Sequence, residues 1–416
     1  MVDYQKFTLK NGLTVLLHQD DATPMVAVNV LYKVGSKNES PSKTGFTHLF
    51  EHLMFGGTPN VSNFDKAMQK AGGENNAFTN SDITNFYDLM PYQNLKSALW
   101  LEADRMRGIN LDKKSLKTQK KVVVEEFKET CLNEPYGDMW HHISEMLYPD
   151  HPYNWPTIGK EIAHIESSSI EDVQKFFYEY YRPDNAILSI CGKIDMDLLK
   201  DQVEEWFGEI DCGLDDIPAL HEVPHMAVEG KKTITSNVPS PCIVLGFKMK
   251  DRLHDDYYIA DLISDILSSG RSSRFYQNLI KENEIFSNID AYISGVTEEG
   301  AFVVEGKLMD GILLDDAHEA IWNELDSLRN KPLDELELRK IKNKAESNLV
   351  FSETNVLSKA MSLAYYEYLG DVDLINTEYL KYEDITSEDI QRVANDIFDI
   401  NKVATLIYLP NDQKQV

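Results

Sequence analysis

The same succession of segments occurs twice along the 416 residues of this chain. In the first half, an apolar strand is predicted at residues 25–34, helical segments follow, and a closing apolar strand is predicted at residues 185–191. The second half repeats this order between strands predicted at residues 242–249 and 403–409. A chain of this length exceeds what one hydrophobic core usually serves, so domains of about 200 residues each are expected. The pattern therefore predicts two similar domains.

The boundary between these domains is predicted near the middle of the chain. Between Gly208 and Gly230, glycine, proline and charged residues interrupt every periodic pattern, which favours a connector. We assign a first domain to residues 1–215 and a second domain to residues 216–416. The first domain is expected to open with a β-hairpin at residues 7–18.

The chain is strongly acidic, with 69 Asp and Glu residues against 41 Lys and Arg residues and a formal net charge of −28. Phosphate groups are bound by basic surfaces, so this balance argues against nucleic acid and against an anionic membrane surface as partners. It is compatible with basic or neutral peptides, although acidity also serves solubility alone. No apolar run approaches the length of a membrane span.

The cysteines and the first residues bear on the cellular compartment. None of the four cysteines forms a C-x-x-C pair, and small buried or half-buried thiols are expected at Cys131, Cys191, Cys212 and Cys242. Residues 1–6 carry neither the basic nor the apolar stretch of a signal peptide. A cytoplasmic protein is therefore expected, or a periplasmic one if a signal peptide has been removed.

The segment His48-Leu49-Phe50-Glu51-His52 carries the strongest chemical signal. In a helix, His48 and His52 are one turn apart, so both imidazoles project from one face at a distance that suits two ligands of one Zn²⁺. Glu51 lies beside that face, where a carboxylate that is not itself a ligand can accept a proton from water and return it to a leaving amine. The order H-x-x-E-H is the inverzincin signature.

A third ligand is expected from the segment at residues 115–133, which contains no proline or glycine and has apolar residues near helical spacing. Three glutamates of this segment compete for the role. Glu126 lies on the stripe that also contains Val123, Glu125 is rotated from it by about 100°, and Glu129 shares the stripe of Glu126. Residue spacing alone leaves the three candidates open.

With these residues in place, the sequence resembles the pitrilysin and mitochondrial processing peptidase family of zinc metallopeptidases. Members carry H-x-x-E-H and, further along the chain, a glutamate that is often found within V-V-x-E-E. By this match Glu126 is implied to be the third Zn²⁺ ligand. Many members have a glutamate seven residues before this ligand, where the chain has Gln119. The resemblance implies that Gln119 hydrogen-bonds a ligand or water beside the metal.

Further segments match the family in the same order. Gly72-Gly73-Glu74-Asn75-Asn76-Ala77-Phe78-Thr79 resembles its G-G-x-x-N-A-x-T segment, and His151-Pro152-Tyr153 resembles a stretch downstream of the third ligand. In the family, the first of these segments is an edge strand that pairs with the substrate backbone. The resemblance therefore implies substrate binding by Asn76, Ala77, Phe78 and Thr79.

The second half departs from the family at two positions. Single-chain and homodimeric relatives carry an arginine and, seven residues later, a tyrosine, which bind the substrate and stabilise the tetrahedral intermediate. Ile280 and Ser287 stand at these positions. The resemblance then implies a homologous partner subunit that supplies the arginine and tyrosine in a heterodimer, with a homodimer as the alternative.

The resemblance implies an α+β fold of two similar domains, each an antiparallel sheet covered by helices, with Zn²⁺ in the first domain only. It implies a zinc-dependent endopeptidase that hydrolyses peptides or unfolded polypeptide segments, with Glu51 as general base. Two other functions are compatible with the resemblance. One is a non-catalytic scaffold, since some family members are core subunits of a respiratory complex. The other is a peptide-binding subunit of a larger complex.

Overall fold

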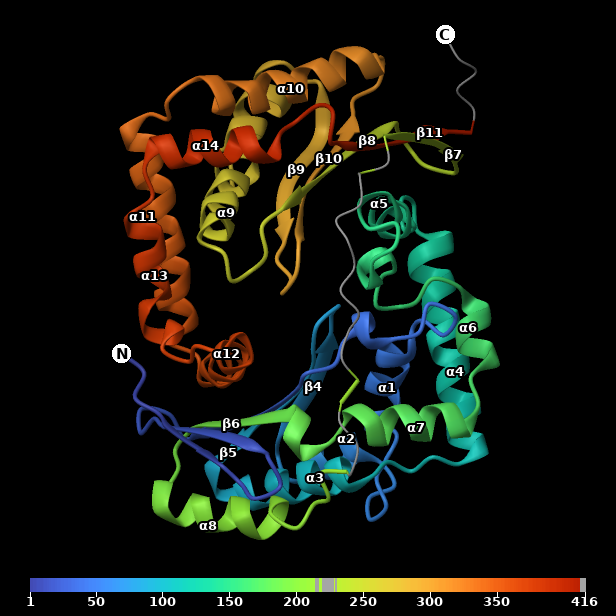
Figure 1. Ribbon diagram of the computed structural model, residues 1–416, viewed down its shortest axis with the longest axis vertical. Helices are drawn as coiled ribbons and strands as arrows, with labels where there is room; N and C mark the ends of the chain where they lie inside the picture. The colour runs from blue at the N-terminus through green and yellow to red at the C-terminus, as the bar shows by residue number, and fades with distance from the viewer. Residues whose placement is uncertain (214–216, 219–227, 229, 412–416) are drawn as a thin grey trace. The chain divides into compact units, whose positions relative to one another are not determined.

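The computed structural model describes residues 1–213, 217–218, 228 and 230–411. These residues form two compact units of mixed α and β structure, and the α+β prediction of two domains with helix-covered sheets is confirmed (Figure 1). Unit 1 consists of the described residues of Met1–Lys128, Trp155–Glu222 and Val350–Thr377, and unit 2 of those of Glu129–Asn154, Val223–Leu349 and Glu378–Val416. The boundary predicted at residues 215 and 216 lies outside the described residues, as does most of the connector predicted at 208–230.

Each unit contains one sheet, and the strands follow the apolar segments of the sequence. The sheet of unit 1 has the order β1-β2-β6-β3-β5-β4, and that of unit 2 has the order β7-β11-β8-β10-β9. The strands are β1 (Gln5–Thr8), β2 (Thr14–Gln19), β3 (Met25–Tyr32), β4 (Glu74–Thr79), β5 (Thr84–Pro91), β6 (Ala186–Gly192), β7 (Lys231–Ser236), β8 (Cys242–Met249), β9 (Phe286–Ser294), β10 (Gly300–Leu308) and β11 (Ala404–Pro410).

The two sheets share one topology, which supports the predicted duplication. When β1 is set aside, the strands of both sheets lie in the order first, fifth, second, fourth, third along the chain. The prediction of antiparallel sheets needs one correction, because each sheet contains one parallel pair, β2 with β6 and β7 with β11. The chain between the two strands of each parallel pair contains the other three strands of that topology and several helices, and it returns in the same direction beside the opening strand, which a short hairpin turn cannot do.

Helices cover both sheets. They are α1 (Phe46–Phe55), α2 (Phe64–Lys70), α3 (Leu95–Arg107), α4 (Lys113–Phe127), α5 (Met139–Leu147), α6 (Ile162–Ser167), α7 (Ile170–Tyr180), α8 (Met196–Phe207), α9 (Asp255–Ser268), α10 (Leu314–Asn330), α11 (Glu335–Ser352), α12 (Val356–Leu369), α13 (Leu374–Glu383) and α14 (Ser387–Ile397). The helix predicted at residues 115–133 is continuous, but its last turns, Lys128–Asn133, are π-helical.

Each unit contains a helical segment from the other half of the sequence. Helix α12 packs on the sheet of unit 1, where the hydroxyl of Ser189 on β6 donates to the backbone carbonyl of Ala360 at 2.6 Å (Figure 1). Helix α5 packs on the sheet of unit 2, where Gly246 of β8 leaves room for the side chain of Ile143. These helices cover sheet faces that would otherwise be exposed. The two compact units therefore do not coincide with the first and second halves of the sequence.

The opposite face of the sheet in unit 1 positions the functional residues. Alternate apolar residues of the central strands point to this face, and they pack against the buried residues of α1 and α3. Of the four cysteines, Cys131, Cys191 and Cys242 are buried and Cys212 is half-buried, all as free thiols, which confirms the prediction. No helix in the described part of the chain combines the length and the apolarity that a bilayer crossing requires.

Candidate metal centre and active site

Helix α1 begins at a buried turn that the rest of unit 1 holds in place. Its N-cap residue is Gly45, whose φ of 84° lies in the left-handed region that favours glycine. Gly45 has no side chain with which to cap the helix, and the carboxylate of Glu39 takes this role. It accepts hydrogen bonds from the backbone N–H groups of Gly45 and Thr47, both at 2.8 Å, and from the Thr47 hydroxyl at 2.7 Å. Burial raises the pKa of the Glu39 carboxyl to about 7, whereas these hydrogen bonds favour its ionised form, which also complements the helix dipole.

The rotation of α1 is set by its apolar face. Leu49, Phe50, Leu53 and Met54 are buried in the core of unit 1. The remaining face carries His48, Glu51 and His52, which are only partly buried. The apolar residues between the histidines therefore orient the whole H-x-x-E-H motif away from the core.

Helix α4 supplies the third side chain of the cluster. It starts at Asp112, whose carboxylate accepts from the backbone N–H of Ser115 at 2.6 Å, and its buried residues include Val123 and Phe127. With this face in the core, Glu126 turns toward α1. Glu125 instead points outward and forms an exposed ion pair of 2.8 Å with Lys128.

Three ligand atoms meet between α1 and α4. The Nε2 atoms of His48 and His52 are 3.2 Å apart, and Oε2 of Glu126 lies 3.3 Å from His48 Nε2 and 3.2 Å from His52 Nε2. Ligand atoms at about 2.0–2.1 Å from Zn²⁺ in a tetrahedral arrangement are about 3.3 Å from one another. The triangle therefore has the size that a single zinc ion requires. No other group of three such residues was found among the described residues.

The charges of these groups suit metal binding. The hydrogen bond and attraction to His48 lower the pKa of the Glu126 carboxyl, although partial burial opposes this shift. Burial, together with the neighbouring His48, lowers the pKa of the His52 imidazole. Both shifts favour the ionised carboxylate and the neutral imidazole, which are the forms that coordinate a metal. Two neutral imidazoles and one carboxylate are a known ligand set of catalytic zinc.

Glu51 is held beside this triangle by the edge strand of the sheet. Its Oε2 accepts a hydrogen bond of 2.6 Å from the hydroxyl of Thr79, the last residue of β4. Strand β4 lies at the end of the strand order and pairs with β5 through its whole length. The side chain of Ala77 faces the same side as that of Thr79, whereas Asn76 and Phe78 face the exposed side.

Gln119 lies on α4 near the C-terminal end of α1. It is two helical turns before Glu126 on α4, and its side-chain nitrogen lies 3.8 Å from the position that a Cβ on Gly56, the C-cap of α1, would occupy. Its side chain therefore lies beside the end of α1. Its predicted interaction with a metal ligand or water remains a prediction.

The residues predicted to replace an arginine and a tyrosine lie in unit 2. Ile280 is half-buried in the π-helical segment Phe275–Glu282. Ser287 is exposed on β9 and donates to the backbone carbonyl of Lys307 at 3.1 Å. Arg274, at the start of this π-helical segment, pairs with both carboxylate oxygens of Glu337, at 3.0 and 2.8 Å, which indicates a structural role for this arginine.

Three contacts of the site are not predicted by the sequence. Glu39 precedes α1 by several residues, and no local motif marks it as the cap of that helix. The indole N–H of Trp155 also donates to Glu39 at 3.1 Å, a contact that crosses more than a hundred residues of sequence. The Thr79 to Glu51 contact is likewise not predicted, although the sequence predicts other roles for both residues. Only the folded chain brings these pairs together.

A duplicated α+β fold with H-x-x-E-H and a distant glutamate in one unit defines the inverzincin class of metallopeptidase folds. The sequence matches the family described as Insulinase (Peptidase family M16) at residues 14–160 and that described as Peptidase M16 inactive domain at residues 167–345. The chain belongs to the M16 family of peptidases, the family of the pitrilysins and processing peptidases.

Individual relatives agree with this assignment. The zinc protease PqqE of Helicobacter pylori is 27% identical over 414 residues, which are 98% of this chain and 93% of that protein. The crystal structure of a protease from Helicobacter pylori is 28% identical with a TM-score of 0.93, and the match covers 99% of this chain and 100% of that one. The periplasmic protease PqqL from Escherichia coli shares the fold, at 15% identity and a TM-score of 0.79, and the match covers 99% of this chain but 48% of PqqL.

Proposed function

We propose that this chain is the zinc-bearing subunit of a metalloendopeptidase that hydrolyses peptides or unfolded segments of polypeptides. The observation that carries the proposal is the triangle of His48, His52 and Glu126 with Glu51 beside it on the same helix. The name of the Helicobacter relative, a zinc protease, supports the metal and the reaction class.

Each residue of the site has one task in this reaction. His48, His52 and Glu126 would hold Zn²⁺, which in such sites polarises a carbonyl and makes water more acidic. Glu51 is not one of the three ligands, and its carboxylate is free to accept the proton of the attacking water. It would then give that proton to the nitrogen of the leaving amine, which completes the cleavage of the peptide bond.

The edge strand β4 offers a means of holding the substrate. One row of its backbone N–H and C=O groups is paired with β5, and its other side ends the strand order of the sheet. An extended peptide could add to this side by β-augmentation, with contributions from Asn76, Ala77, Phe78 and Thr79. This mode reads the backbone more than the side chains, and it requires an unfolded segment. It supports polypeptide segments of varied sequence as substrates.

A second subunit is part of the proposal. Ile280 and Ser287 cannot donate hydrogen bonds to a developing oxyanion as an arginine and a tyrosine would. A homologous chain could supply these donors, either a different protein or a second copy. The correspondence of this chain to about half of PqqL is compatible with a working unit of twice this length.

The decisive experiment is the Glu51→Gln variant. Loss of the general base should lower the turnover of an unstructured fluorogenic peptide by about 10²-fold or more. The three ligands are unchanged, so zinc content should remain that of the wild type. The exposed Glu125→Gln serves as the matched control and should retain both properties. Near-normal turnover by Glu51→Gln would show that Glu51 is not the base.

The same measurements separate the alternatives. A scaffold subunit does not require zinc. If the purified chain binds no zinc at high affinity, the scaffold function is supported. A peptide-binding subunit would bind zinc and peptide but cleave nothing, even in the presence of its partner. The intact set of ligands and the carboxylate beside them support the enzyme over both.

A further inference from the structure

Helix α4 carries a concentration of positive charge that is unusual for this protein. Residues 113–128 contain six lysines and two glutamates, whereas the whole chain has 41 basic and 69 acidic residues. At helical spacing, Lys113, Lys117, Lys120 and Lys128 fall on one stripe that runs along the helix for about 22 Å. Such a stripe is a local reversal of the charge of the molecule.

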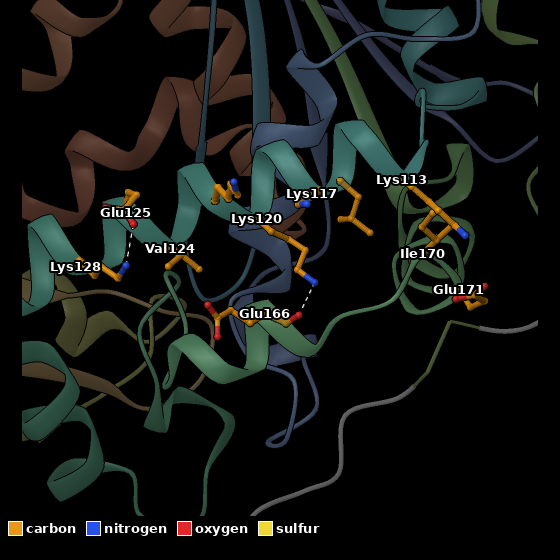
Figure 2. Close-up of a pocket in the computed structure, with 11 residues that line it drawn as sticks. Lys113, Lys117, Lys120, Val124, Glu125, Lys128, Glu166, Ile170 and Glu171 are labelled. Atoms are coloured by element: carbon orange, nitrogen blue, oxygen red, sulfur yellow. Dashed lines mark hydrogen bonds and ion pairs between the residues drawn. The ribbon is translucent and has the colours of Figure 1, made fainter.

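The stripe lines a pocket within unit 1. The pocket has a volume of about 850 Å³ and lies beside α4, with Glu166 of α6 and Ile170 of α7 among its lining residues (Figure 2). Lysines form its rim, and the aliphatic side chains of Leu116 and Val124 contribute to its walls. A ligand in this pocket would meet positive charge and apolar surface together. We define this feature as the lysine groove.

Most of the positive charge in the lysine groove is not neutralised by carboxylates. Lys120 donates to the backbone carbonyls of Glu166 and Ser168, at 2.5 and 2.9 Å, and these carbonyls carry no full charge. Lys128 pairs with Glu125 at the exposed end of the groove. In the described part of the chain, Lys113, Lys117 and Lys121 have no ion pair or hydrogen bond through their ammonium groups. With respect to the described residues, the groove thus retains unpaired positive charges along its length.

The lysine groove is separate from the metal centre. On α4, Glu126 projects from the side opposite to the lysine stripe and faces α1. The groove instead faces α6 and the start of α7, as Figure 2 shows. A ligand could therefore occupy the groove without touching the side chains of His48, His52 or Glu126.

We propose that the lysine groove binds an acidic, amphipathic segment of another polypeptide in helical form. A helix of about 15 residues matches the length of the stripe. Glutamates or aspartates three and four residues apart on such a helix would reach the lysines, while leucine-like side chains between them would contact the aliphatic walls. Charge complementarity and the mixed lining together select this class of partner.

The surroundings disfavour a denser polyanion. Glu166 and Glu171 also line the groove, and the net charge of the whole chain is −28. Nucleic acid or polyphosphate brings a high, uniform density of negative charge, which these carboxylates and the overall field would repel. A peptide can place its few carboxylates against the lysines and leave the positions near the glutamates neutral. The proposal does not depend on peptidase activity.

Fluorescence anisotropy with the full chain tests this inference. The probe is a labelled helical peptide of about 15 residues with glutamates on one face and leucines beside them. We expect binding that weakens as NaCl is raised, because partly exposed charges are screened. The triple variant Lys113→Glu, Lys117→Glu, Lys121→Glu should bind the peptide at least about 10-fold more weakly, since three attractions become repulsions.

A matched control isolates the groove from net charge. The triple variant Lys66→Glu, Lys70→Glu, Lys114→Glu changes the net charge by the same amount at exposed residues outside the lining and should bind like the wild type. Thermal melting checks that both variants are folded. Equal affinity in the wild type and the groove variant, or equal losses in both variants, would overturn the proposal. Tighter binding of inorganic polyphosphate than of the peptide would overturn the choice of a polypeptide.

Discussion

The hydroxyl of Thr79 donates a hydrogen bond of 2.6 Å to the carboxylate of Glu51. This contact joins the strand proposed to hold the substrate to the group proposed to move the proton. It fixes one carboxylate oxygen of Glu51 and leaves the other available. A peptide that adds to β4 would therefore lie next to a base whose orientation is already set.

The first prediction concerns this contact. Thr79→Val keeps the shape of the side chain but removes the hydroxyl, and hydrogen bonds to charged groups contribute about 1.5–3 kcal/mol. We expect kcat to fall by about 10-fold or more, with zinc content unchanged, because Glu51 loses the hydrogen bond that orients its carboxylate. Thr79→Ser should restore most of the rate. If Thr79→Val and Thr79→Ser behave alike, the hydroxyl does not orient the base.

A second prediction distinguishes the three glutamates of the helical segment that we propose supplies the third ligand. Glu126→Gln should lose most of its zinc. Substitution of a residue that only hydrogen-bonds a metal ligand weakens metal affinity by about 10–100-fold, and loss of a ligand itself should weaken it further. Glu125→Gln and Glu129→Gln should bind zinc like the wild type. Metal analysis after dialysis against a weak chelator compares the three. Equal losses at Glu125 and Glu126 would contradict the proposed ligand set.

The third prediction concerns the cap of α1. In Glu39→Gln, an amide N–H₂ group replaces one carboxylate oxygen. It then faces either the backbone N–H and hydroxyl of Thr47, which donate to Oε1, or the N–H groups of Gly45 and Trp155, which donate to Oε2. At least one buried donor then lacks an acceptor, at a cost of about 1–3 kcal/mol. We expect a lower denaturation midpoint and weaker zinc binding, since α1 carries both histidines. The exposed Glu74→Gln is the control and should leave both quantities unchanged.

A fourth prediction uses the buried carboxyl of Asp88, which burial and the neighbouring Glu102 give a pKa well above its usual value. The folded state therefore holds the proton of Asp88 more tightly than the unfolded state does. The resulting stabilisation is complete below the unfolded pKa of about 3.9 and is lost as the pH rises through the folded pKa. Asp88→Asn stays neutral at every pH. Its stability relative to the wild type should increase from pH 4 toward alkaline pH in urea denaturation, and a constant difference would contradict this explanation.

The fifth prediction concerns the second subunit. The chain alone should cleave a peptide slowly, because the absence of preorganised oxyanion donors costs about 10²-fold or more in rate. Addition of a homologous chain that carries the arginine and the tyrosine should raise the rate and produce a complex of about twice the mass. Light scattering and peptidase assays on separate and mixed chains measure both effects. Full activity of this chain as a monomer would show that its own residues supply the donors.

Much of the fold could be predicted because its signals are local. Continuous apolar runs marked the central strands β3, β6, β8 and β11, whose observed bounds differ from the predicted ones by at most two residues. The parallel pairs and the exchange of α5 and α12 between the units could not be predicted. They depend on which helices and strands, distant in sequence, bury their apolar faces against one another. The spacing of apolar residues within one element does not indicate its packing partner.

The sequence alone determined the chemistry available to this protein. A spacing of four residues on a helix places two imidazoles on one face, and this holds in any helix that contains them. Only the tertiary structure decided which glutamate joins them, because the rotation of α4 depends on how its residues Val123 and Phe127 pack in the core. That packing turns Glu126 toward α1, and it also leaves the lysines of the opposite side facing outward. The physical reason is that a helix fixes the angles between its own side chains, whereas burial against the rest of the chain fixes the direction in which the helix faces.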